Sequence, residues 1–268
     1  MMSVPARHLP DDIAATLRHL QSELDVVPGF EARVAEGKRR FKLRNRKNDV
    51  TFRAVRQTLR AMCSGVQRCM YCEDSCGDQV EHFRPKDHYP GLVFAWENFL
   101  YACGACNGPG KGVRFPLFRS SEGSAVLMPG VDAPLPPPHG DALLIDPRTE
   151  DPMELMELDL VSTFYFVSRY PEGSRQHQRW RYTADILGLN ERDALCRQRE
   201  QKFKLFKLLI EVVAREVEPA RRAVQLARSR DLVSQESHQT VWAEMKRQRE
   251  RHPTLVELFG AVPEALEW

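Results

Sequence analysis

Long hydrophobic runs are absent from this sequence. No window approaches the roughly 18 apolar residues that a membrane-spanning helix needs. The opening stretch, MMSVPARHLPDDIAATL, contains no apolar segment of the kind that forms the core of a signal peptide. We therefore expect a cytoplasmic protein that makes no contact with a membrane.

A strong net charge is absent as well. The 39 Lys and Arg residues nearly balance the 37 Asp and Glu residues, which leaves a formal net charge of +2. The distribution is uneven, because the segment from Lys38 to Arg60 holds ten basic residues and a single acidic one, Asp49. Such a segment suits a phosphate backbone, but it is also typical of a solvated helix face. Both interpretations stay open at this point.

Internal repeats are missing too, and the hydrophobic content of 42% is ordinary for a globular protein. We expect an α+β fold that is mostly helical. A β-branched and aromatic run within residues 157–174 predicts a strand or short hairpin. Apolar residues at helical spacing predict the helices. These helices are expected over residues 11–24, 51–62, 174–189, 191–217, 219–230 and 237–251.

The composition changes twice along the chain, which predicts three units. Residues 1–62 form a basic helical region. Residues 63–118 are rich in Cys, Gly, His and aromatic side chains and predict a small metal-dependent unit. Residues 119–268 form an accessory region, with a hairpin followed by helices, and this region begins with an irregular connection at 128–141 that is rich in Pro and Gly.

Two cysteine pairs stand out within the middle unit. Cys69 and Cys72 form one CxxC pair, and Cys103 and Cys106 form another. Disulfides are rare in a reducing cytoplasm, and paired cysteines at this spacing are typical of tetrahedral Zn²⁺ sites. Four thiolates close every coordination position, so we predict a structural zinc ion that stabilises a unit too small to fold on apolar burial alone.

The remaining cysteines are assigned less directly. The spacing of Cys76 from Cys72 also permits ligation, but its use would break the symmetric pair arrangement, so we treat Cys76 as a spare. Cys63 and Cys196 are interpreted as small core residues.

An acid and an imidazole lie between the two pairs. Glu81 and His82 fall in VEHFRPK, whose alternation predicts a strand that sends them to opposite sides unless it is twisted or bulged. Asn98 precedes the second pair, and Asn107 follows it. This order resembles the HNH, or ββα-metal, nucleases of the four-cysteine type. The resemblance rests on CxxC, Glu-His, Asn and CxxCN, followed by Lys111 and a glycine.

The resemblance implies a metal-dependent endonuclease. Hydrolysis of a phosphodiester requires an activated water, and an imidazole is suited to take its proton, a role that we assign to His82. Glu81 and Asn107 would hold one Mg²⁺ or Mn²⁺ ion. Asn98 would fix the loop that orients the histidine. Phosphate contacts are expected from Arg84, Lys86 and Lys111.

Two departures from the family pattern concern this site. The usual CNxxKG is here CNGPGKG, which is one residue longer and contains Pro109, so the helix that follows would begin late. The acid before the histidine is Glu81, where many relatives have Asp, and its longer side chain must still reach the ion.

Segments further along, KGVRFP, LLIDPRTEDPMELMELD and ADILGLN, resemble the HNH component of Septu-type and retron-associated antiphage defence systems. That resemblance implies an ABC-type ATPase as partner and nucleic acid as substrate, with DNA favoured. Two alternatives remain. One is an enzyme that cleaves RNA such as tRNA, and the other is a zinc-knuckle adaptor that binds nucleic acid without catalysis.

Overall fold

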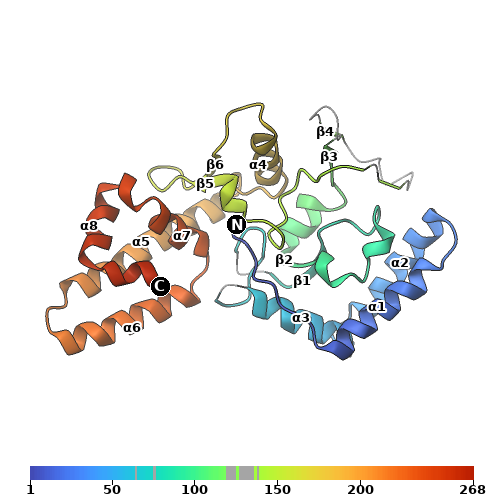
Figure 1. Ribbon diagram of the computed structural model, residues 1–268, viewed down its shortest axis with the longest axis horizontal. Helices are drawn as coiled ribbons and strands as arrows, with labels where there is room; N and C mark the ends of the chain where they lie inside the picture. The colour runs from blue at the N-terminus through green and yellow to red at the C-terminus, as the bar shows by residue number, and fades with distance from the viewer. Residues whose placement is uncertain (64, 75–76, 119–124, 127–135, 138) are drawn as a thin grey trace.

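The N-terminal part of the chain is a group of three helices. The computed structural model describes residues 1–268 except 64, 75–76, 119–124, 127–135 and 138. Helices α1 (Asp11–Asp25), α2 (Phe30–Arg44) and α3 (Val50–Met62) lie beside and beneath the central strands, in blue and cyan in Figure 1. The predicted helices at 11–24 and 51–62 are therefore confirmed.

A two-stranded antiparallel hairpin occupies the centre. Strand β1 (Gln79–His82) pairs with β2 (Phe99–Ala102), which sets His82 opposite Phe99 at the end of β1. The loop between the strands carries two short 3-10 turns, η1 (Pro90–Leu92) and η2 (Trp96–Asn98). The predicted strand in VEHFRPK is confirmed over its first three residues.

The helix expected after the second strand is not seen. Residues Cys106–Lys111 form a six-residue π-helical turn, η3, and within the described part of residues 63–118 no α-helix follows it. Pro109 lacks a backbone N–H, and the glycines on either side of it have low helix propensity, so an α-helix cannot propagate here. The structure therefore shows a two-stranded hairpin here and does not show the expected ββα core.

Short strands connect the centre to the C-terminal helices. Strand β3 (Leu117–Phe118) pairs with β4 (Ala125–Val126), and after η4 (Pro152–Glu154) strand β5 (Met156–Leu158) pairs with β6 (Phe166–Ser168). The hairpin predicted within 157–174 is confirmed. Most of the expected connection at 128–141 lies outside the described residues.

The C-terminal part is helical. In Figure 1, α5 to α8 form an orange and red group on the side opposite α1 to α3. The last predicted helix, 237–251, ends early as α7. Helix α8 was not predicted, although a proline at its first position is a common helix start. The elements are α4 (Arg175–Ile186), α5 (Asp193–Arg215), α6 (Pro219–Gln235), α7 (Gln239–Arg247), η5 (Arg249–Arg251), α8 (Pro253–Ala261) and η6 (Pro263–Glu267).

One buried apolar cluster includes side chains from all three predicted units, whose boundaries stay a prediction. Phe52, Val55 and Leu59 of α3 are fully buried, as their helical spacing predicted. Four aromatic rings, contributed by Phe41, Phe52, Phe94 and Phe99, contact one another beside the β1–β2 hairpin. Among the helices of the described residues, none is long and apolar enough to cross a membrane.

Candidate metal centre and its surroundings

The two cysteine pairs meet in space. Cys69 and Cys72 lie in the turn before β1, and this turn is held to β2 by a hydrogen bond from the Met70 N–H to the Tyr101 carbonyl, 2.8 Å long. Cys103 and Cys106 follow β2. The four sulfur atoms lie within 4.8 Å of one another, and all four residues are buried. The predicted meeting of the pairs is confirmed.

The spacing of the sulfurs fits one zinc ion. Cys72 Sγ and Cys103 Sγ are 3.8 Å apart, and with Zn–S bonds of about 2.3 Å the edge of a tetrahedron is also about 3.8 Å. Burial raises the pKa of the Cys69 thiol, so a bound cation is what would favour the thiolate form. The cluster is therefore suited to hold a metal such as zinc.

Of the other cysteines, two are described, and neither belongs to this cluster. Cys76 lies outside the described residues. Cys63 and Cys196 are half-buried rather than core residues, and their sulfurs contact backbone carbonyls. Between the first pair and β1, Gly77 is required, because a Cβ there would lie 2.2 Å from the carbonyl of Arg68.

Arg192 contacts the cluster from the C-terminal region. Its Nη2 donates to Cys106 Sγ at 3.4 Å and to the Leu187 carbonyl at 2.9 Å. Burial opposes the charge, but the sulfurs of Cys106 and Cys72 outweigh it and raise the pKa of the guanidinium. Sequence reasoning missed this residue, because no local motif marks an arginine that lies 86 positions after its cysteine.

Glu81 is paired with Lys111. The Lys111 Nζ lies 2.6 Å from Glu81 Oε1 and donates to the His82 carbonyl at 2.8 Å. The side chain of Lys111 is 0% exposed and that of Glu81 is 6% exposed. Burial disfavours both charges, so it raises the pKa of Glu81 and lowers that of Lys111. The expected phosphate contact of Lys111 is therefore not available in this conformation, because its ammonium is buried against a carboxylate.

His82 lies in an aromatic environment. Its Nε2 is 2.9 Å from the Val93 carbonyl, and its ring centroid is 4.4 Å from that of Phe41 and 5.3 Å from that of Phe99. Only 3% of the residue is exposed. Burial, together with the charge of Lys86, lowers the pKa of His82 to about 3. The imidazole is neutral near pH 7.

Asn98 holds the loop between the strands. Its Oδ1 accepts from the Arg84 N–H at 2.7 Å, and its Nδ2 donates to the carbonyls of Arg84 and Leu92, each at 3.0 Å. Val93, which follows Leu92, supplies the carbonyl that contacts His82. The side chain is thus placed where the loop-holding role assigned to it requires, while its part in catalysis stays a prediction.

The structure does not join Asn107 to Glu81. The amide of Asn107 donates to Gln79 Oε1 at 2.8 Å on the exposed side of the turn. The Glu81 carboxylate contacts Lys111 instead. A divalent ion shared by Glu81 and Asn107 stays a prediction, and in this conformation each side chain has another partner.

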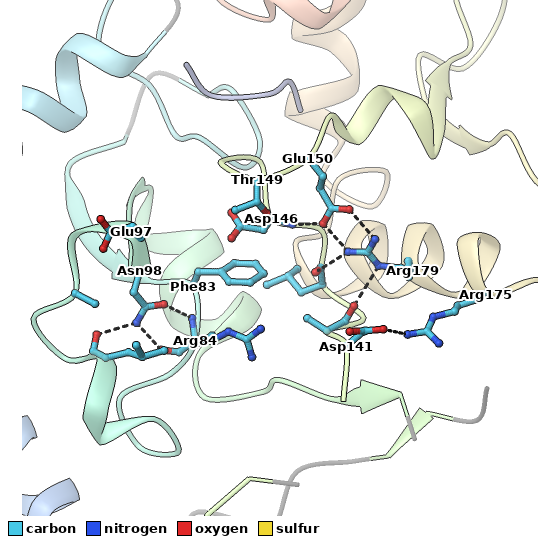
Figure 2. Close-up of a pocket in the computed structure, with 14 residues that line it drawn as sticks. Phe83, Arg84, Glu97, Asn98, Asp141, Asp146, Thr149, Glu150, Arg175 and Arg179 are labelled. Atoms are coloured by element: carbon cyan, nitrogen blue, oxygen red, sulfur yellow. Dashed lines mark hydrogen bonds and ion pairs between the residues drawn. The ribbon is translucent and has the colours of Figure 1, made fainter. Parts of the chain in front are cut away.

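Arg84 borders a cavity of about 580 Å³ between the β1–β2 loop, the segment 141–150 and α4 (Figure 2). Its guanidinium lies 5.2 Å from the ring centroid of Tyr89. Across the cavity, Arg179 binds both oxygens of Glu150 at 2.6 Å. Because acids and bases line the same walls, charge alone does not select a phosphate here. The other expected phosphate contact, Lys86, has its Nζ 5.6 Å from the ring centroid of Phe41.

Comparison with known proteins finds one partial likeness. A stretch of 72 residues is 42% identical to "Septu protein PtuB" of Bacillus thuringiensis. It covers 25% of this chain and 26% of that protein, so the chain matches about a quarter of the relative's length. The likeness is partial. No protein-family model matches the chain, and no solved structure matches it.

Proposed function

We propose that the protein is a zinc-stabilised endonuclease that acts in an antiphage defence system. The likeness to a Septu protein supports the defence role. The HNH resemblance of the motif supports the chemistry. The observation that carries the proposal is the combination of the four-cysteine cluster, which joins the segments before β1 and after β2, with the Asn98 contacts, which hold the loop whose Val93 carbonyl binds His82.

The contact with Val93 assigns the roles of the two ring nitrogens of His82. A carbonyl oxygen only accepts hydrogen bonds, so Nε2 is the donor in this contact. The lone pair of the neutral ring is then on Nδ1, and a neutral imidazole with a free lone pair can take a proton from water. On this proposal Nδ1 is the general base of phosphodiester hydrolysis.

The described conformation is an inactive one on this proposal. Phe41 of α2 packs against the His82 ring, and Lys111 blocks the carboxylate that was expected to bind Mg²⁺ or Mn²⁺. Cleavage therefore requires α2 to move away from His82 and Lys111 to leave Glu81. A partner ATPase, which the family resemblance implies, would trigger this change.

Nucleic acid is the proposed substrate, and the basic segment supports it. Among the described residues of the Lys38–Arg60 segment, five exposed basic side chains have no carboxylate within ion-pair distance. Exposed cations without a carboxylate partner are suited to bind phosphates of either DNA or RNA. We call these five residues the basic strip. They are Lys42, Arg46, Lys47, Arg53 and Arg60.

A cleavage assay tests the proposal. The full chain would be incubated with plasmid DNA and with tRNA in Mg²⁺ or Mn²⁺, as wild type, Phe41→Ala, Phe41→Ala/His82→Ala and Phe41→Ala/His19→Ala. His19 is an exposed histidine of α1 and serves as the control. We expect Phe41→Ala to increase cleavage of DNA, and His82→Ala to abolish it. Cleavage by Phe41→Ala/His82→Ala at the level of Phe41→Ala would contradict the proposal.

A second candidate is the zinc-knuckle adaptor without catalysis. The buried Lys111–Glu81 pair and the burial of His82 favour it, because a stable core explains both without any reaction. Phage protection in cells discriminates the two. An adaptor keeps protection when His82 is replaced by Gln, whereas a nuclease loses it at the same protein level.

A further inference from the structure

Arg192 connects three parts of the molecule through one guanidinium. Its Nη2 donates to Cys106 Sγ at 3.4 Å and to the Leu187 carbonyl at 2.9 Å, and its Nε donates to the Gly188 carbonyl at 3.2 Å. Leu187 and Gly188 directly follow helix α4, and Arg192 precedes the first residue of α5. The side chain thus links the α4–α5 corner to the cysteine cluster.

The corner is shaped for this contact. Gly188 has φ of +57°, a left-handed conformation that favours glycine. On the side of the metal centre, a Cβ at Gly110 would lie 3.1 Å from the Ile186 carbonyl and 2.6 Å from that of Ala105, so only glycine permits this approach. The end of α4 also presents carbonyls without helical partners, which favour a cation.

The charge of the centre gives Arg192 a function there. Four thiolates around one Zn²⁺ carry a formal charge of about −2, and a buried charge without compensation is unfavourable. A guanidinium that donates to a thiolate offsets part of this charge and fixes the orientation of the ligand.

We propose that Arg192 is a positioning residue of the metal centre, and that through it metal occupancy is coupled to the docking of the α4–α5 corner. The proposal rests on the zinc centre proposed above and is independent of nuclease activity.

Zinc affinity in the full chain is the first test. Chelator competition would compare wild type with Arg192→Gln, Arg192→Lys and the control Arg197→Gln, which alters an exposed arginine of α5. We expect Arg192→Gln to bind zinc about 10- to 100-fold more weakly. The zinc affinity of Arg192→Lys should lie between those of wild type and Arg192→Gln, because lysine keeps the positive charge but lacks the several N–H donors of a guanidinium. An Arg192→Gln affinity within about twofold of that of Arg197→Gln overturns the proposal.

Two further readouts separate positioning from general destabilisation. With Co²⁺ in the site, loss of a hydrogen bond to sulfur should move the sulfur-to-metal charge-transfer band of Arg192→Gln to longer wavelength. In wild type, removal of zinc should increase amide hydrogen exchange at residues 187–195 more than in α7. An unmoved band, or equal exchange in both segments, overturns the coupling. A wild-type chain that binds no zinc overturns the metal centre itself, and this proposal with it.

Discussion

Lys111 and Glu81 form a buried ion pair, with the ammonium 2.6 Å from a carboxylate oxygen and the two side chains 0% and 6% exposed. The family resemblance assigned these residues to other partners, a phosphate for Lys111 and a divalent ion for Glu81. In the described conformation each satisfies the other. The ion pair therefore stabilises the described conformation. If the protein is a nuclease, Lys111 and Glu81 must separate before catalysis.

Loss of one member of the pair should be more harmful than loss of both. Lys111→Met leaves a buried carboxylate without its cation, and Glu81→Leu leaves a buried ammonium, so each should reduce the free energy of unfolding by about 3–5 kcal/mol. The double variant Lys111→Met/Glu81→Leu removes both charges and should be more stable than either single variant. Urea denaturation of the zinc-loaded chain measures this. Additive losses in the double variant would show that the two groups are not coupled.

The pH dependence of stability should report on His82. Its pKa of about 3 in the folded protein lies below the ordinary value of 6.5. The unfolded chain therefore binds more protons between these values, and stability falls as the pH drops below about 6.5. Relative to His82→Phe, wild type should lose about 2 kcal/mol of unfolding free energy between pH 7.5 and pH 5.

Denaturation curves of wild type and His82→Phe across this range provide the measurement. Effects of acid on the thiolates and on other histidines are common to both proteins and cancel in the difference. Parallel stability profiles would mean that His82 titrates normally and is accessible to water.

The sequence predicted what depends on local spacing. The CxxC pairs, the strand of Glu81 and most of the helices were found, because each is encoded within a few neighbouring residues, whereas α2 and α8 were not predicted. The strand alternation also predicted that Glu81 and His82 diverge, and they do take different partners, Lys111 and Val93.

Partners that lie far apart in the sequence could not be predicted in the same way. Arg192 reaches Cys106 only because α4 ends against the η3 turn, and no pattern near either residue indicates that contact. The missing helix had a local signal in Pro109, which predicted a late start but not a π-helical turn. The burial of His82, in strand β1, depends on Phe41, which lies in helix α2 and is distant in the sequence.

Asn98 should be important for the stability of the loop between β1 and β2. Asn98→Ala removes three hydrogen bonds to the backbone of Arg84 and Leu92, and buried partners left without a bond are costly. We expect a loss of about 2–3 kcal/mol of unfolding free energy and faster amide exchange at residues 84–93. Glu97→Ala, at the exposed neighbouring position, is the control. Equal effects of the two substitutions would argue against this role of Asn98.

The basic strip should bind nucleic acid through phosphates. Arg53→Glu/Arg60→Glu should weaken the binding of a labelled DNA duplex in fluorescence anisotropy. Its plot of log affinity against log salt should be shallower than that of wild type by up to about 1.8, since each phosphate contact contributes about 0.9. The matched control, Arg197→Glu/Arg228→Glu, changes two exposed arginines outside the strip. If the control loses as much affinity as the strip variant, only total charge is involved.

X-ray absorption at the zinc edge of the purified full chain is the most direct test of the metal centre on which this account depends. We expect one zinc ion per chain with four sulfur neighbours at about 2.3 Å, supplied by Cys69, Cys72, Cys103 and Cys106. A spectrum with nitrogen or oxygen neighbours in place of sulfur, or a chain that retains no zinc, would contradict it.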